Sequence, residues 1–235
     1  MTTDQEPVES LPASKVTDVQ PEFLRQDLKP GRLTLVGLLL EAGCVLVALF
    51  LAYFGLYDHA QPLNKLFDMR LAAMIGWSAG GFAAISLCAI AFLVIRWKPF
   101  REFRNFVLRE LVPLFAPLSM TQVALISASA GIGEEMLFRW SLQGGLQHLV
   151  PGTYGLIAAL IIASVAFGMV HAVTPMYALI ATVIGSVLGL ILIFSGSVIP
   201  AILAHAFYDF VAILILRRNR NPGNHSASTF DRTVE

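Results

Sequence analysis

Long apolar segments dominate the chain from residue 33 onward. A helix needs about 20 mostly apolar residues to cross roughly 30 Å of hydrocarbon. Five segments meet this requirement without interruption: Leu33–Leu56, Leu71–Ile95, Tyr154–Val173, Met176–Phe194 and Ile199–Leu216. Strand-like alternation is absent, and only helices or closed barrels satisfy the backbone polar groups in lipid. The pattern therefore predicts an all-α, polytopic transmembrane helix bundle.

A further apolar stretch, from Leu111 to Val150, is interrupted. The interruptions are Pro113, Pro117 and the segment Gly131–Glu135. Proline breaks helices because it lacks the amide proton and clashes with the preceding turn. We expect this stretch to be a broken or re-entrant element that leads into one more span. The bundle would then have about six spans plus this broken segment.

Both ends of the chain are polar. Residues 1–30 contain prolines and acidic groups and lack the apolar core of a signal peptide, and residues 218–235 are similarly polar. Such composition buries too little apolar surface to fold. We expect two disordered cytoplasmic tails, 1–30 and 218–235, around a bundle that occupies residues 31–217.

Basic residues indicate the orientation, because cytoplasmic loops carry an excess of Lys and Arg. Three clusters fall on one predicted side, whereas only Lys65 and Arg70 fall on the other. The clusters are Arg25, Lys29 and Arg32, then Arg96, Lys98, Arg101 and Arg104, and finally Arg217, Arg218 and Arg220. Both termini are therefore expected in the cytoplasm.

Composition supports the membrane assignment. The chain of 235 residues is 56% hydrophobic and 14% charged, against about 25% charged residues in soluble domains. This excludes a water-soluble globule and a disordered chain. A net charge of zero argues against a nucleic-acid partner. Cys44 and Cys88 both lie in apolar runs, which argues against a disulfide framework.

The region from Leu111 to Leu216 has only four charged side chains. They are Glu134, Glu135, Arg139 and Asp209, and three histidines accompany them, His148, His171 and His205. A charge at membrane depth costs at least about 2.5–3.5 kcal/mol and indicates function by default. Glu135 and Arg139 are four residues apart, as are His205 and Asp209, so each pair shares a helix face.

The depths of these groups agree. If Pro151 marks a helical hairpin, Glu135 and His171 lie about 24 and 28 Å from that turn at about 1.5 Å per residue. From a turn at Gly196, His205 and Asp209 lie about 14 and 20 Å into the next helix. All of them except His148 therefore fall at the midplane or in the inner half of the bilayer, where they can converge on one polar cavity. Glu41, inside the first predicted span, has no assigned role.

Three short motifs contain these residues. Residues Glu134 to Arg139 resemble the EExxxR motif of the CPBP family, the Abi-like CAAX-protease and bacteriocin-processing intramembrane proteases. Phe167 to His171 resembles the FxxxH motif of that family, and His205 to Asp209 resembles its HxxxN or HxxxD motif. The resemblance places a protease-like core in residues 111–217.

The resemblance implies a role for each residue. Glu134 would be the general base that activates a water, with His171 helping to hold it. His205 and Asp209 would bind the scissile carbonyl oxygen, although an ionised Asp209 would repel an oxyanion and is better suited to orienting His205. The supporting residues would be the ion pair Glu135–Arg139 and Phe167, which we expect to pack under the site.

The resemblance leaves the need for a metal open. Glutamate, histidine and aspartate side chains could hold Zn²⁺, but the HExxH helix of zinc peptidases is absent. We expect no obligatory cofactor, with zinc as the alternative.

The favoured function is an intramembrane endopeptidase of the CAAX prenyl endopeptidase kind, dependent on glutamate. Its substrate would be a lipidated peptide, a leader peptide or another membrane-associated protein, and its location the bilayer of a bacterial inner membrane. The alternatives are a non-catalytic immunity or scaffold protein and a proton-coupled transporter. Against the transporter, the chain shows no inverted repeat of broken helices.

Overall fold

The computed structural model describes residues 29–56, 71–94 and 98–218, and these ranges contain helices and no strand. The elements in chain order are α1 (Pro30–Leu51), the π-helical η2 (Ala52–Leu56), α2 (Leu71–Val94), α3 (Lys98–Phe106), the π-helical η4 (Val107–Leu111), α4 (Val112–Phe115), α5 (Met120–Glu135), the π-helical η5 (Met136–Gln143), α6 (Gly144–Leu149), α7 (Thr153–Val170), α8 (Pro175–Ser195) and α9 (Ile199–Arg218). Within these ranges the prediction of an all-α fold is confirmed.

The long apolar helices fit an integral membrane protein. In the described ranges, four helices are long and apolar enough to cross a membrane, and a bent pair raises the number to five. The four are α7, α8, α9 and the first helix from Pro30 to Phe54, and α2 adds a shorter apolar stretch at Ala73–Ser86. The predicted total of six spans and the cytoplasmic termini remain predictions. Residues 1–28 and 219–235, which contain nearly all of the predicted tails, lie outside the described residues.

The broken element predicted between Leu111 and Val150 is present. The helices Lys98–Phe115 and Met120–Leu149 meet at an angle of 117°. The break lies at residues 116–119, which include Pro117. Ser119 caps the start of α5, because its side chain accepts a hydrogen bond from the backbone amide of Gln122 in a capping box. The expected interruption at Gly131–Glu135 is wrong, because α5 continues through this segment without a break.

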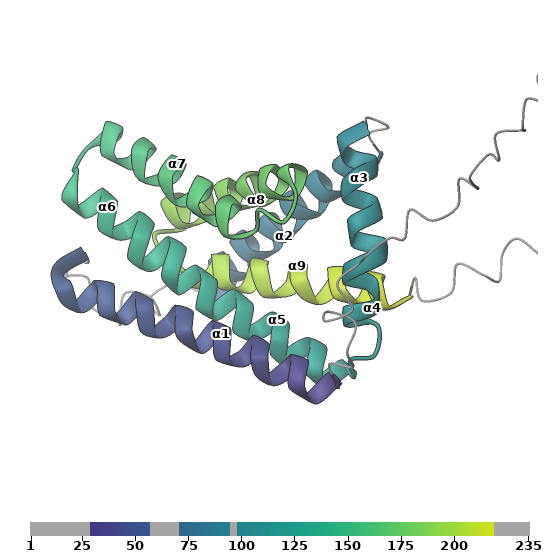
Figure 1. Cartoon of the computed structure of the whole chain (residues 1–235). Helices are drawn as coiled ribbons and strands as arrows, with labels where there is room; N and C mark the ends of the chain where they lie inside the picture. The colour runs from purple at the N-terminus through teal and green to yellow at the C-terminus, as the bar shows by residue number, and fades with distance from the viewer. Residues whose placement is uncertain (1–28, 57–70, 95–97, 219–235) are drawn as a thin grey trace, which may run out of the picture.

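The glycines of this segment admit neighbouring helices. A Cβ atom at Gly131 would lie 2.8 Å from the Ile202 carbonyl oxygen of α9, and a Cβ at Gly133 would lie 2.8 Å from the Glu41 carbonyl oxygen of α1. Both distances are shorter than real Cβ contacts. Close approach of helices through small residues is typical of membrane bundles. Helix α5 is therefore held between α1 and α9, and Figure 1 shows α1 and α5 running side by side.

Basic side chains gather at one end of the bundle. Figure 1 shows the start of α1, helices α3 and α4 and the end of α9 at the same end. Arg217 in the last turn of α9 donates a hydrogen bond to the sulfur of Met120, the first residue of α5. The exposed cations there include Lys29, Arg32, Lys98, Arg101, Arg104, Arg109 and Arg218. This arrangement follows the expected charge asymmetry of a membrane protein.

The contact of α5 with α9 gives a first prediction. We expect Gly131→Ala to lower the free energy of unfolding by about 1–3 kcal/mol, because the added methyl group overpacks a backbone contact. Gly80→Ala in α2 is the matched control, since a Cβ there meets nothing within 4 Å and alanine favours a helix by about 0.5–1 kcal/mol. Thermal unfolding in detergent measures both variants. Equal midpoints would contradict the packing role of Gly131.

Candidate functional site

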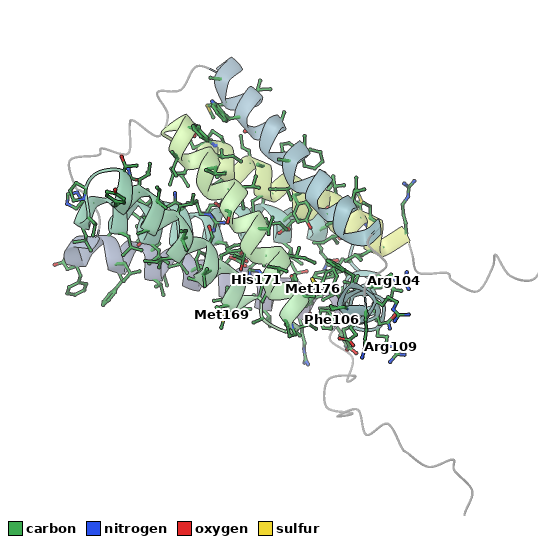
Figure 2. The ribbon with its side chains drawn as sticks, turned by 90° about the horizontal axis from the view of Figure 1, so that it is seen from above. Arg104, Phe106, Arg109, Met169, His171 and Met176 are labelled. Carbon is green, nitrogen blue, oxygen red and sulfur yellow. The ribbon has the colours of Figure 1, made fainter. Side chains whose placement is uncertain are left out.

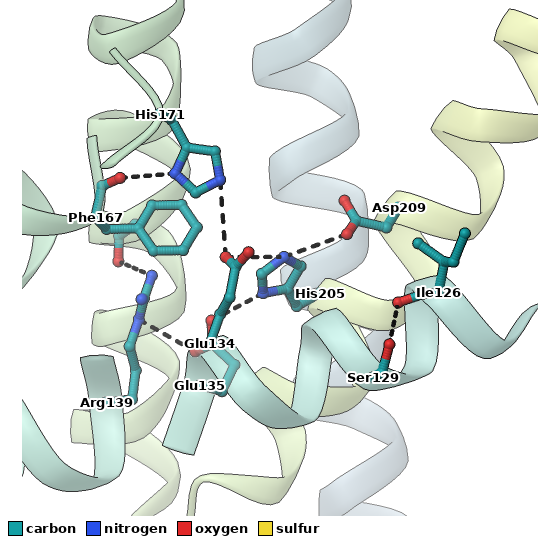
Figure 3. Close-up of polar contacts among 10 residues, drawn as sticks. Ile126, Ser129, Glu134, Glu135, Arg139, Phe167, His171, His205 and Asp209 are labelled. Carbon is teal, nitrogen blue, oxygen red and sulfur yellow. Dashed lines mark hydrogen bonds and ion pairs between the residues drawn. The ribbon is translucent and has the colours of Figure 1, made fainter. Parts of the chain in front are cut away.

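Glu134, at the end of α5, faces two imidazole rings from two other helices (Figure 3). Its Oε2 atom lies 3.8 Å from Nε2 of His171 and 3.9 Å from Nε2 of His205. His171 follows the last residue of α7, and His205 lies in the second turn of α9. The structure thus brings Glu134 together with two histidines that lie 37 and 71 positions later in the chain.

His205 is oriented by Glu135, the residue after Glu134. The distance from His205 Nδ1 to Glu135 Oε1 is 2.9 Å. Because Glu135 also pairs with an arginine, its carboxylate is the acceptor and Nδ1–H is the donor. The opposite ring atom, Nε2, therefore faces Glu134 and also Asp209, whose Oδ2 is 3.5 Å away. We expected Asp209 to orient His205, but the shorter contact that fixes the ring comes from Glu135.

His171 is oriented by its own chain. Its Nδ1 atom lies 2.7 Å from the Phe167 carbonyl oxygen, so Nδ1–H donates and Nε2 is free to face Glu134. The Phe167 ring contacts the His171 ring with centroids 4.6 Å apart and the His205 ring at 5.9 Å. Phe167 is buried and packs against both imidazoles, as the FxxxH resemblance implied for packing under the site.

Arg139 lies beneath this group and is fully buried. Its Nε atom is 3.1 Å from Glu135 Oε2, and its Nη2 donates to the Gly185 carbonyl oxygen at 3.2 Å. The guanidinium also stacks over the Phe167 ring, with 4.4 Å from Cζ to the ring centroid. A buried charge needs such partners, because the desolvation penalty is several kcal/mol per ion. Arg139, Glu135 and His205 therefore form one connected buried chain of charge and hydrogen bonds.

Accessibility rises from one side of the site to the other. The side chains of Glu135 and Arg139 are 0% and 1% exposed, and His205 is 6% exposed. Glu134, His171 and Asp209 are 17%, 23% and 28% exposed. The buried pair thus forms the floor, while Glu134, His171 and Asp209 are the more exposed side chains of the site.

Tyr177 of α8 lies between His171 and α3. Its ring centroid is 5.7 Å from that of His171 and 6.2 Å from that of the α3 residue Phe106. Figure 2 shows His171 and Phe106 on the same side of the molecule. Sequence reasoning missed Tyr177. Its only signal was its position shortly after the His171 motif, which does not distinguish it from other aromatic residues.

Two other polar residues, His148 and Glu41, differ in how near they lie to the site. His148 lies in α6, exposed and at a distance in sequence and structure from the site, as expected for an interfacial residue. Glu41 lies in α1, and its carboxylate abuts Gly133, the residue before Glu134. The sequence singled out Glu41 as a charge inside an apolar span but indicated no partner for it.

Metal binding depends on how the donor side chains are arranged. In the described parts of the chain, no three His, Cys, Asp or Glu side chains are arranged so that they could hold a metal ion. Hydrolytic zinc sites use three protein ligands and one water. The expectation that no metal is obligatory stays a prediction.

Comparison with known proteins agrees with the motifs. Residues 116–211 match the family model described as Type II CAAX prenyl endopeptidase Rce1-like. The match confirms, for this part of the chain, the family suggested by the three motifs. It begins at the break before α5 and ends in α9, so it includes every residue of the site except Glu41. Neither the curated proteins nor the solved structures gave a match.

The buried chain of charges gives a second prediction. We expect Arg139→Met to lower the free energy of unfolding by about 3–5 kcal/mol, because it leaves the Glu135 carboxylate buried without its cation. The double variant Arg139→Met, Glu135→Gln should lose less, since the uncompensated charge is removed. Thermal unfolding of the two variants and the parent protein measures this. A double variant at least as unstable as Arg139→Met alone would contradict the proposed coupling.

Proposed function

We propose that the protein is an intramembrane endopeptidase in which Glu134 activates a water molecule to hydrolyse a peptide bond. The single observation that carries this proposal is that the Glu134 carboxylate faces both imidazoles, at 3.8 and 3.9 Å, on the accessible side of a buried charge network. The match of residues 116–211 to the CAAX prenyl endopeptidase family supports the same reaction class.

The distance between Glu134 and His171 suits a shared water. A water placed about 2.8 Å from each atom fits beside the pair, whose separation is 3.8 Å. Since Nδ1–H of His171 is engaged by the Phe167 carbonyl, Nε2 of the neutral ring accepts a hydrogen bond from that water. Glu134 accepts the other proton, as a general base within hydrogen-bond reach of the nucleophile must.

His205 is suited to the carbonyl oxygen. Its Nδ1–H is held by Glu135, so a proton on Nε2 makes the ring an imidazolium, which is stabilised by the carboxylates of Glu135 and Asp209 around it. Such a donor stabilises the negative charge that develops on the scissile oxygen. Asp209 then acts through His205, by stabilising the protonated ring at 3.5 Å from its Nε2.

The steps balance with these groups alone. Glu134 takes a proton from the water as its oxygen attacks the carbonyl carbon, and the oxyanion forms next to His205. The tetrahedral intermediate collapses, the carbon–nitrogen bond breaks, and Glu134 returns the proton to the leaving amine. The products are a carboxylic acid and an amine, which become a carboxylate and an ammonium group by proton transfer in water, and Glu134 is again ionised for the next turnover.

The substrate class follows from the surroundings of the site. Helices long and apolar enough to cross a membrane surround it, so a peptide that reaches the site must be held at the membrane. We propose a lipidated or leader-type membrane-associated peptide, cleaved near the cytoplasmic face of a bacterial inner membrane. The partners of the protein would then be the lipid bilayer and this peptide.

The catalytic roles give a third prediction. We expect Glu134→Gln and His171→Ala each to lower kcat more than 1000-fold, because general-base catalysis contributes about 10²–10⁴-fold and water positioning adds to it. Cleavage of a prenylated peptide by the purified protein in proteoliposomes measures this. Ser129→Ala is the matched control on α5, since its hydroxyl bonds only to the Ile126 carbonyl of its own helix. Full activity of both variants would reject the proposal, and a retained cellular phenotype in Glu134→Gln would favour a non-catalytic binding protein.

The metal-free mechanism gives a fourth prediction. We expect phenanthroline or EDTA to leave the cleavage rate unchanged after prolonged incubation, because the steps require only side chains and water. A zinc peptidase treated in parallel shows that the chelator is effective. Loss of activity that added Zn²⁺ restores would contradict the metal-free reaction and leave a zinc-dependent one.

A further inference from the structure

Glu41 occupies an unusual position in the first span. It is the only charged residue between Leu33 and Leu56. It lies on the face of α1 that turns toward the bundle, together with the buried Thr34 and Ala48. The preceding residue, Leu40, lies on the outer face and is 65% exposed. A carboxylate at this depth costs at least about 2.5–3.5 kcal/mol on insertion scales. A group retained at that cost requires an explanation.

Gly133 makes the space for this carboxylate. An alanine at position 133 would place its Cβ atom 2.5 Å from Glu41 Oε2 and 3.1 Å from Glu41 Cα. Real Cβ atoms do not approach other atoms under 3.0 Å. Gly133 directly precedes Glu134. The packing of α1 on α5 therefore places the Glu41 carboxylate against the backbone next to Glu134, the proposed base.

Two carboxylate oxygens at this junction have no hydrogen-bond donor among the described residues. Oε2 of Glu41 and Oε2 of Glu134 are both buried and accept no hydrogen bond from the protein. Buried polar atoms are nearly always paired with protein or with ordered water. A water molecule has two protons and so meets two acceptors at once.

We propose that Glu41 is a positioning residue of the reaction site, which accepts a hydrogen bond from a second water held beside Glu134 and so orients the Glu134 carboxylate toward the hydrolytic water. This inference rests on the proposed function. It adds a residue from α1, which lies outside the matched residues 116–211. The matched core supplies the base and both imidazoles, and α1 supplies the additional acceptor on the side of Gly133.

A purely structural role for Glu41 predicts different behaviour. A polar side chain that held α1 to α5 would make a hydrogen bond across the interface, and its removal would cost about 0.5–2 kcal/mol. The Glu41 Oε2 atom makes no such bond in the described structure. Replacing a carboxylate whose buried Oε2 accepts no hydrogen bond by a smaller neutral residue is expected to leave the stability unchanged or to raise it.

The first test measures whether residue 41 faces water, and it needs no catalytic activity. In a background with Cys44→Ser and Cys88→Ser, the variants Glu41→Cys and Leu40→Cys are treated with a small, charged methanethiosulfonate reagent in proteoliposomes. We expect Glu41→Cys to react at least tenfold faster, because Leu40 lies on the outer face of α1. Equal rates, or no reaction at position 41, would overturn the proposal.

The second test separates positioning from structure by kinetics. We expect Glu41→Ala to lower kcat tenfold or more, with KM within twofold and the thermal midpoint unchanged or raised, and Glu41→Gln to recover part of kcat because its amide oxygen still accepts a hydrogen bond. Thr34→Ala is the matched control, since that hydroxyl on the same face bonds to the Pro30 carbonyl of its own helix. A lower midpoint with unchanged kcat would overturn the proposal. If the parent protein cleaves no peptide, the proposed function fails, and the labelling contrast still decides the location of Glu41.

Discussion

The buried chain from Arg139 through Glu135 to His205 is the constraint on which the site depends. Two full charges at 0–1% exposure are costly in an apolar bundle unless they are paired, and here Arg139 pairs with Glu135 at 3.1 Å and Glu135 contacts His205 at 2.9 Å. Because Glu135 holds His205 by Nδ1, the ring presents Nε2 to the accessible side. The orientation of His205 thus depends on Glu135, the carboxylate that also neutralises Arg139. The neighbouring Glu134 lies outside this chain.

Helix packing makes this arrangement possible. The two glycines before Glu134 allow α9 and α1 to approach α5 on different sides, so that His205 and Glu41 reach the end of the same helix. The end of α7 supplies His171, whose ring is fixed by the Phe167 carbonyl one turn earlier. Gly185 of α8 closes the floor by accepting a hydrogen bond from Arg139. Four helices beyond α5 therefore contribute to one small polar site in an otherwise apolar bundle.

Sequence reasoning predicted the parts of this structure that depend on local pattern. Apolar length predicted the long helices, and four of those in the described ranges are long and apolar enough to cross a membrane. The scarcity of charge after Leu111 singled out Glu134, His171 and His205, which the structure brings together, because a membrane penalises every unneeded charge. The prediction was wrong where tertiary contacts reverse a local preference: glycines at 131 and 133 weaken an isolated helix, yet close contacts with α9 and α1 hold it together. The bond from Glu135 to His205 and the location of Glu41 depend on packing between segments distant in sequence, so no spacing rule could find them.

The central claim is that a water molecule is held between a carboxylate and an imidazole inside the membrane. The most direct measurement is an experimental structure of the protein in a lipid nanodisc at a resolution that shows ordered water. The account predicts a water peak within about 3 Å of both the Glu134 carboxylate and His171 Nε2. An apolar side chain or a lipid tail filling that space, with Glu134 turned away from both imidazoles, would contradict it.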